Sequence, residues 1–82
     1  MEEQQAIVLL KQGDNRGLEV LVQLYYLQAV RASYLIIQDK QLAEDTVQTS
    51  FINLIHKIHQ FDESRSFRPW FRRYLCRRLM SL

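Results

Sequence analysis

Apolar residues recur at helical spacing along the whole chain, and the first half divides into two predicted helices. Residues 3–12 carry an acid in the first turn and place Ile7 and Leu10 on one face, and Gly13 ends the segment. Asp14 or Asn15 is positioned to cap a second helix that runs to about residue 38. This second segment is apolar almost all round, so we expect it to be central to the fold.

The second half predicts two further helices separated by a polar loop. Asp39 is the expected N-cap of a third helix over residues 40–60. Residues 62–66 are all polar and form the loop, after which Pro69 fits the first turn of a fourth helix that runs toward the end of the chain. No alternating strand pattern or internal repeat is present in the sequence. The prediction is an all-α fold, a compact bundle of about four helices in a single domain over residues 1–82.

At 100° per residue the third helix separates into two different faces. Its core face is expected to contain Ala43, Val47, Phe51, Leu54 and Ile58. The opposite face mixes polar groups with two isoleucines, which suggests a surface for another protein, although isolated exposed apolar residues are common. Its members are Asp45, Gln48, Ile52, Ile55, His56 and His59.

The wheel of the second helix predicts an inward arc of Leu18, Leu21, Leu24, Tyr25, Ala32, Leu35 and Ile36. The opposite arc is also apolar and contains Tyr26, Leu27, Val30, Tyr34 and Ile37. Two apolar faces indicate either a central position in the bundle or contact with both the core and a partner.

Positive charge is concentrated at the C-terminal end of the chain. The net charge is +2, but residues 1–60 carry five Lys or Arg against seven acids, whereas residues 61–82 carry six arginines against two acids. The same final stretch holds five of the nine aromatic residues. On the fourth helix, Arg68, Arg72, Arg73 and Arg77 share one side, with no acid among them. Because arginine suits phosphates and stacks on bases, this face predicts a polyanionic partner more strongly than a merely solvated surface.

The composition excludes several classes of site. The single cysteine, Cys76, cannot form an internal disulfide, and the fold must therefore depend on packing. His56 and His59 are three residues apart, but no third ligand accompanies them, so we expect neither a metal nor a cofactor. No nucleophile–base arrangement or phosphate-binding glycine loop is present, so we predict no enzymatic activity.

The longest apolar stretch, residues 30–37, is interrupted by Arg31 and Ser33, and the N-terminus has no basic run. From this we expect no membrane insertion and no signal peptide, and a cytoplasmic protein.

Three motifs occur in a characteristic order: GDNRGLEVLVQLYY from Gly13, QLAEDTVQTSF from Gln41, and SFRPWF from Ser66 after the polar loop. Together they resemble region 2 of bacterial RNA polymerase sigma factors, specifically the extracytoplasmic-function type. The resemblance covers about residues 10–74, and its most specific part is AEDxxQxxF, residues 43–51. It implies a factor that binds core RNA polymerase and promoter DNA to begin transcription.

The resemblance implies a polymerase-binding site on the third helix. In the family, the helix that carries the DxxQ motif docks on the clamp helices of the polymerase β′ subunit. In this sequence the implied contact residues are Asp45, Gln48, Thr49, Ile52 and His56. This set overlaps the outer face that the wheel predicts.

The resemblance also implies a promoter site in the loop and the fourth helix. In the family, the loop captures a base flipped from the non-template strand of the minus-ten element, and the last helix lines the junction between duplex and single strand. The implied DNA-binding residues are Arg65, Ser66, Phe67, Arg68, Arg72 and Arg73.

Two departures from the family pattern affect these expectations. Leu75 and Arg77 stand where family members usually have a small residue and an asparagine. No second domain for the minus-thirty-five element follows, so we expect the chain to be a fragment of a longer factor. Two alternatives stay open: a helical DNA-binding domain that acts without polymerase, and a protein-interaction module, for example one bound by an anti-sigma factor through Tyr26, Val30 and Tyr34.

Overall fold

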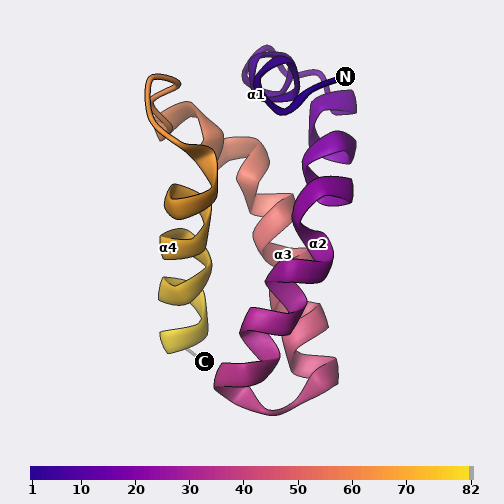
Figure 1. The fold of residues 1–82 in the computed structure, drawn as a ribbon, viewed down its shortest axis with the longest axis vertical. Coiled ribbons are helices and arrows are strands. Elements are labelled where there is room, and N and C mark those ends of the chain that lie inside the picture. The colour runs from indigo at the N-terminus through magenta and orange to yellow at the C-terminus, as the bar shows by residue number, and fades with distance from the viewer. Residues whose placement is uncertain (82) are drawn as a thin grey trace.

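The computed structural model describes residues 1–81 and forms four α-helices with no strand in that range (Figure 1). The elements are α1 (Glu3–Lys11), α2 (Arg16–Ile37), α3 (Lys40–Lys57), the short 3₁₀ helix η1 (Ile58–Gln60) and α4 (Phe67–Met80). The predicted all-α bundle and the loop at residues 62–66 are confirmed. The expected third helix is divided, because its last turn tightens into η1.

The second helix is the element on which the other helices pack. α2 contacts α1, α3 and α4, and it joins α3 through a short turn at the end of the bundle farthest from α1 (Figure 1). Gln38 takes a left-handed conformation in this turn, with φ 54°. Asp39 then caps α3 as predicted, since its side chain accepts a hydrogen bond of 3.0 Å from the backbone N–H of Leu42.

Buried aromatic rings fill the space between α4 and the rest of the bundle. Phe67 and Phe71 are stacked, with ring centroids 5.5 Å apart, and Phe71 lies 4.9 Å from Phe51 of α3. Phe61 packs edge-on to Phe67 at 5.5 Å. These rings connect α3, the loop and α4, so buried aromatic residues anchor the loop to the core at both of its ends.

A close approach of two backbones fixes α1 against α2. Gly17 of α2 lies so near α1 that an added Cβ would overlap the carbonyl oxygen of Ala6 and crowd the amide nitrogen of Leu10. Only glycine permits this approach, because any other side chain would separate the helices. Its consequence is that residues at the start of α1 hold a defined position beside α2.

The predicted core face of the third helix is confirmed, although its last member, Ile58, belongs to η1. All five predicted residues are buried, and Thr46 and Ser50 are buried beside them. The Ser50 hydroxyl donates a 2.7 Å hydrogen bond to the backbone carbonyl of Thr46, which satisfies it inside the bundle.

The predicted inward arc of α2 is partly wrong. Leu24, Leu35 and Ile36 are exposed, Leu35 by 77%, whereas the buried positions are Gly17, Leu21, Ala29 and Ser33. The physical reason is that α2 packs through small residues where α4 and α3 approach it, so its buried stripe is narrow. Tyr26 and Val30 are half-buried against the core, and of the proposed anti-sigma strip only Tyr34 is exposed.

By length and composition alone, α2 could cross a membrane, with a mean hydropathy of 1.3 over its most apolar window. Within the bundle, three helices pack on α2 and bury Leu21 and Ala29. Leu24, Leu27 and Leu35 remain exposed. The test by itself is weak evidence, since the central helix of a globular bundle also passes it.

Candidate functional site

The five residues expected to bind the polymerase clamp lie together on the outer face of α3. Asp45, Gln48, Thr49, Ile52 and His56 are all exposed, and Ile52 is 62% exposed. Their spacing of three or four residues gives one continuous strip along the helix. Asp45 makes no ion pair with any residue of the described chain, so its carboxylate is available to a partner.

The neighbouring helix supports one member of this strip. The side-chain amide of Gln48 donates a 3.3 Å hydrogen bond to the hydroxyl of Tyr26 on α2. The Tyr26 ring is itself held near Phe51, with centroids 6.5 Å apart. Tyr26 thus holds the Gln48 side chain, a contact that the sequence did not indicate, because the helical wheel of α3 carries no information about α2.

The polar loop has an ordered turn of its own. The Asp62 carboxylate accepts hydrogen bonds from the backbone N–H and the hydroxyl of Ser64, at 2.9 and 2.7 Å. These bonds lower the pKa of Asp62, and the N–H of Arg65 closes the turn on the Asp62 carbonyl at 3.0 Å. Arg65 and Ser66 are exposed beyond this turn, as a nucleic-acid contact requires.

A lysine from α1 holds the start of the loop. The Lys11 ammonium donates a 2.6 Å hydrogen bond to the carbonyl of Phe61 and lies 3.3 Å from the Glu63 carboxylate. It also lies 6.0 Å from the centroid of the Phe61 ring. Since these residues are some 50 positions from Lys11 in sequence, no local pattern could have predicted the contact.

Lys11→Met is expected to loosen the loop, because it keeps the apolar stem and removes the ammonium group. We expect a loss of about 1–2 kcal/mol in the free energy of unfolding and faster hydrogen exchange at the amides of Ser64 and Arg65. Urea unfolding and exchange measured by NMR check this, with Lys40→Met as the control for an exposed lysine that makes no such contacts. Unchanged exchange at both amides would mean that the Asp62 turn holds itself.

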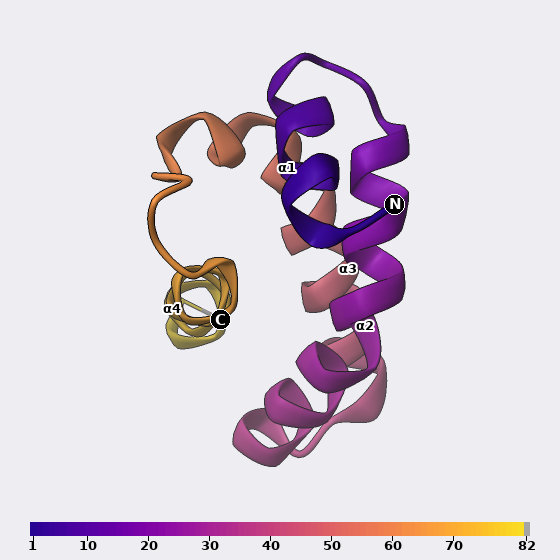
Figure 2. The ribbon, with the colours of Figure 1, turned by 45° about the horizontal axis from the view of Figure 1, so that its top comes forward.

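A cavity of about 250 Å³ opens between α1, α2, the loop and the start of α4. The nearly buried rings of Phe61 and Phe67 lie beneath it, and its polar rim includes Glu3, Tyr25 and Arg68. Figures 1 and 2 both place α1 and the loop at the same end of the bundle. An apolar floor with a polar rim is suited to a flat, polar-edged ring such as a nucleobase.

Tyr25 and Glu3 form a hydrogen bond at the rim of this cavity. The Tyr25 hydroxyl donates to one carboxylate oxygen of Glu3. Burial, then this bond and the carboxylate charge, raise the pKa of Tyr25 to about 12. The Tyr25 hydroxyl keeps the Glu3 carboxylate in place, and the raised pKa extends its protonated state into strongly alkaline solution.

The expected role of Phe67 in binding DNA needs correction. Its ring is only 2% exposed and lies within 6 Å of the rings of Tyr25, Phe61, Trp70 and Phe71. As the first residue of α4, it begins the buried stripe that continues four residues later with Phe71 and then Leu75. A ring in this position cannot stack on a base from its own face, so Phe67 supports the site from below.

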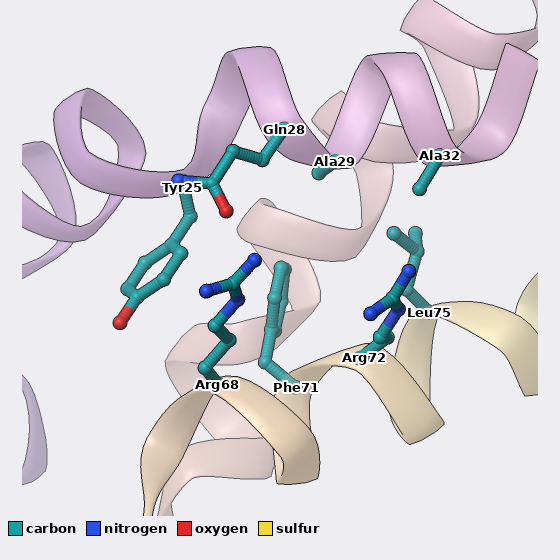
Figure 3. Close-up of a pocket in the computed structure, with 8 residues that line it drawn as sticks. All are labelled: Tyr25, Gln28, Ala29, Ala32, Arg68, Phe71, Arg72 and Leu75. Atoms are coloured by element: carbon teal, nitrogen blue, oxygen red, sulfur yellow. The ribbon is translucent and has the colours of Figure 1, made fainter.

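The arginines of α4 are exposed on two sides of the helix. Arg68 and Arg72 border a shallow groove between α2 and α4, where Figure 3 shows their guanidinium groups flanking the Phe71 ring and pointing toward α2. Arg72 also borders the outer side, with Arg73 and Arg77. None of these four makes an ion pair within residues 1–81, unlike Arg65, which lies 3.8 Å from Asp62. Their charge is therefore available to phosphates.

Residues 1–81 contain no group of His, Cys, Asp and Glu that could hold a metal ion. His56 belongs to the outer strip of α3, and Cys76 is half-buried beside the α4 arginines.

Comparison with known proteins finds one matching family. The model of sigma-70 region 2 matches residues 21–81, which include most of α2, all of α3 and α4, and the loop between them. No curated protein and no solved structure matches the chain. Helix α1 lies outside the matched residues, although it walls the cavity. The chain belongs to the sigma-70 region 2 family, whose role in transcription initiation is to bind core RNA polymerase and to recognise promoter DNA.

Proposed function

We propose that this chain acts in the cytoplasm as region 2 of a sigma factor of the extracytoplasmic-function type. The outer strip of α3 docks on the clamp helices of the polymerase β′ subunit. The loop and cavity capture a base flipped from the non-template strand of the minus-ten element, and the α4 arginines bind the phosphates of that strand. The observation that carries the proposal is the exposed strip of α3. It combines the Asp45 carboxylate, which has no ion pair within the described residues, the Gln48 amide, which is hydrogen-bonded to Tyr26, and the exposed Ile52 side chain.

The strip has the composition of a small protein interface. Ile52 provides apolar surface at its centre, and Asp45 and Gln48 provide a charged acceptor and an amide on one side of it. Burial of the isoleucine contributes affinity, while the polar pair fixes the orientation of the partner. An arginine on the clamp helices would complement the unpaired Asp45 carboxylate.

Base capture requires no covalent chemistry from the protein. Unstacking a base costs a few kcal/mol, and a cavity that receives the base traps a melted state that thermal opening supplies. The ordered Asp62 turn and the Lys11 contacts support this role, because a loop that is already positioned loses less entropy on binding.

Asp45→Ala is expected to weaken binding to an isolated β′ clamp coiled coil by about 1–3 kcal/mol, or roughly 5- to 150-fold in Kd. Gln48→Ala should also weaken it, and Tyr26→Phe should weaken it less, because only the group that holds Gln48 is removed. Isothermal titration calorimetry with the 82-residue chain measures these effects. Glu19→Ala is the matched control, an exposed acid on α2 outside the strip.

Equal affinities for wild type, Asp45→Ala and Gln48→Ala would remove α3 from the interface. If the folded wild type does not bind the clamp at all, the α4 arginines would have to act as a DNA surface without polymerase.

A further inference from the structure

Helix α1 lies outside the residues that the family model matches, yet it contributes a wall of the cavity. We propose that Glu3 of α1 determines which base the cavity accepts, and that it selects bases with an exocyclic amino group, cytosine or adenine, over bases with a carbonyl at the same ring position. This inference rests on the proposed capture of a base by the loop cavity. It adds a specificity-determining residue that lies outside the loop.

Glu3 is held in a defined position at the rim. Its carboxylate accepts a hydrogen bond from the Tyr25 hydroxyl through one oxygen, which leaves the second oxygen free to accept another. The close approach of Gly17 to Ala6 packs α1 tightly against α2 one turn from Glu3, which favours this position of the carboxylate. Glu3 is half-buried, so a hydrogen bond to it is less weakened by competing water than at a fully exposed site.

The other charged groups at the rim are weaker acceptors than Glu3 or are not acceptors. The Glu63 carboxylate lies 3.3 Å from the Lys11 ammonium, whose positive charge already neutralises it. Arg65 and Arg68 are hydrogen-bond donors, suited to a ring carbonyl or a phosphate. Glu3 is thus the acidic group of the cavity rim with a free oxygen and no cationic partner within the described residues.

The donor and acceptor pattern of the bases then gives the preference. Cytosine presents its N4 amino group and adenine its N6 amino group, and each can donate to a carboxylate oxygen. Uracil or thymine presents the O4 carbonyl in the same place, so two acceptors would face each other with no proton between them. The half-buried carboxylate would lose water without gaining a hydrogen bond, which disfavours the complex.

Fluorescence anisotropy with single-stranded decamers of deoxyuridine tests the proposal. One central position is varied between cytosine and uracil, and between adenine and hypoxanthine, so that each pair differs at the amino or carbonyl position. For the wild-type chain we expect the amino-bearing base of each pair to bind about tenfold more tightly. Glu3→Gln should reduce both ratios to about twofold, since an amide can accept from an amino group or donate to a carbonyl.

Two variants separate this effect from general damage. Glu2→Gln removes the same charge from the neighbouring exposed acid, which does not line the cavity, and should leave both ratios unchanged. Tyr25→Phe removes the hydroxyl that holds Glu3 and should lower the ratios only in part.

The outcomes distinguish the two levels of proposal. The role of Glu3 would be overturned if the affinity ratio within each pair of decamers is near one for the wild type, or if the ratio is unchanged in Glu3→Gln. Either result leaves base capture intact. If no decamer binds to the folded chain, both the proposed capture and this inference fail.

Discussion

Phe67→Ala is expected to lower the free energy of unfolding by about 3–5 kcal/mol, because it removes a buried ring from the aromatic cluster. The ring contacts residues of α2, the loop and α4, and the small chain has little other core to compensate for its loss. A domain of this size has a total stability of roughly 4–12 kcal/mol. The loss is therefore about a quarter or more of the total stability, and we expect a markedly lower melting temperature.

Thermal and urea unfolding followed by circular dichroism measure this effect. Phe67→Leu should lose much less, since it retains apolar volume in the same place. Arg68→Ala, at the adjacent exposed position, should change stability by less than about 0.5 kcal/mol. The opposite pattern, a stable Phe67→Ala protein that has lost affinity for single-stranded DNA, would restore Phe67 to the DNA surface.

How far the sequence predicts the fold depends on whether each helix has one apolar face or two. On α3, most apolar residues occupy one arc, so its core face was predicted correctly; on the predicted outer face five of the six residues are exposed, and Ile55 is half-buried against the core. On α2, apolar residues occupy nearly the whole circumference, and the wheel could not show that α4 approaches small residues such as Ala29. Leu24 and Leu35 were therefore placed in the core although they are exposed.

The candidate site could be proposed from the sequence where its residues are contiguous. The loop and the α4 arginines follow one another along the chain, so the charge of the fourth helix and the family resemblance of the loop were enough to propose them. Glu3 and Lys11 belong to the site only because α1 folds back onto the loop, across 22 and 50 residues of sequence to Tyr25 and Phe61. Such contacts depend on the tertiary fold and leave no periodic signal.

The triple variant Arg68→Gln, Arg72→Gln, Arg73→Gln is expected to have the largest effect on DNA binding. Each arginine that neutralises a phosphate of a single strand contributes about 0.7 to the slope of log K against log salt. Removing three should flatten the slope by about 2. If wild type and variant bind equally at 1 M salt, the variant then binds roughly 100-fold more weakly than the wild type at 0.1 M salt. Anisotropy titrations of a labelled single strand over a range of salt concentrations measure both quantities.

Net charge alone could produce part of this effect, so the location of the charge has to be tested separately. The control variant Arg16→Gln, Arg31→Gln, Lys40→Gln removes the same charge from residues on α2 and at the start of α3. If α4 is the phosphate-binding surface, the control keeps nearly the full slope, because direct counterion release depends on charges that contact the strand. If both variants flatten the slope equally, the arginines act through the overall field and α4 is not the site of contact. The slope is more informative than the affinity here, because it counts contacts with phosphate, whereas a loss of affinity could also come from a displaced helix.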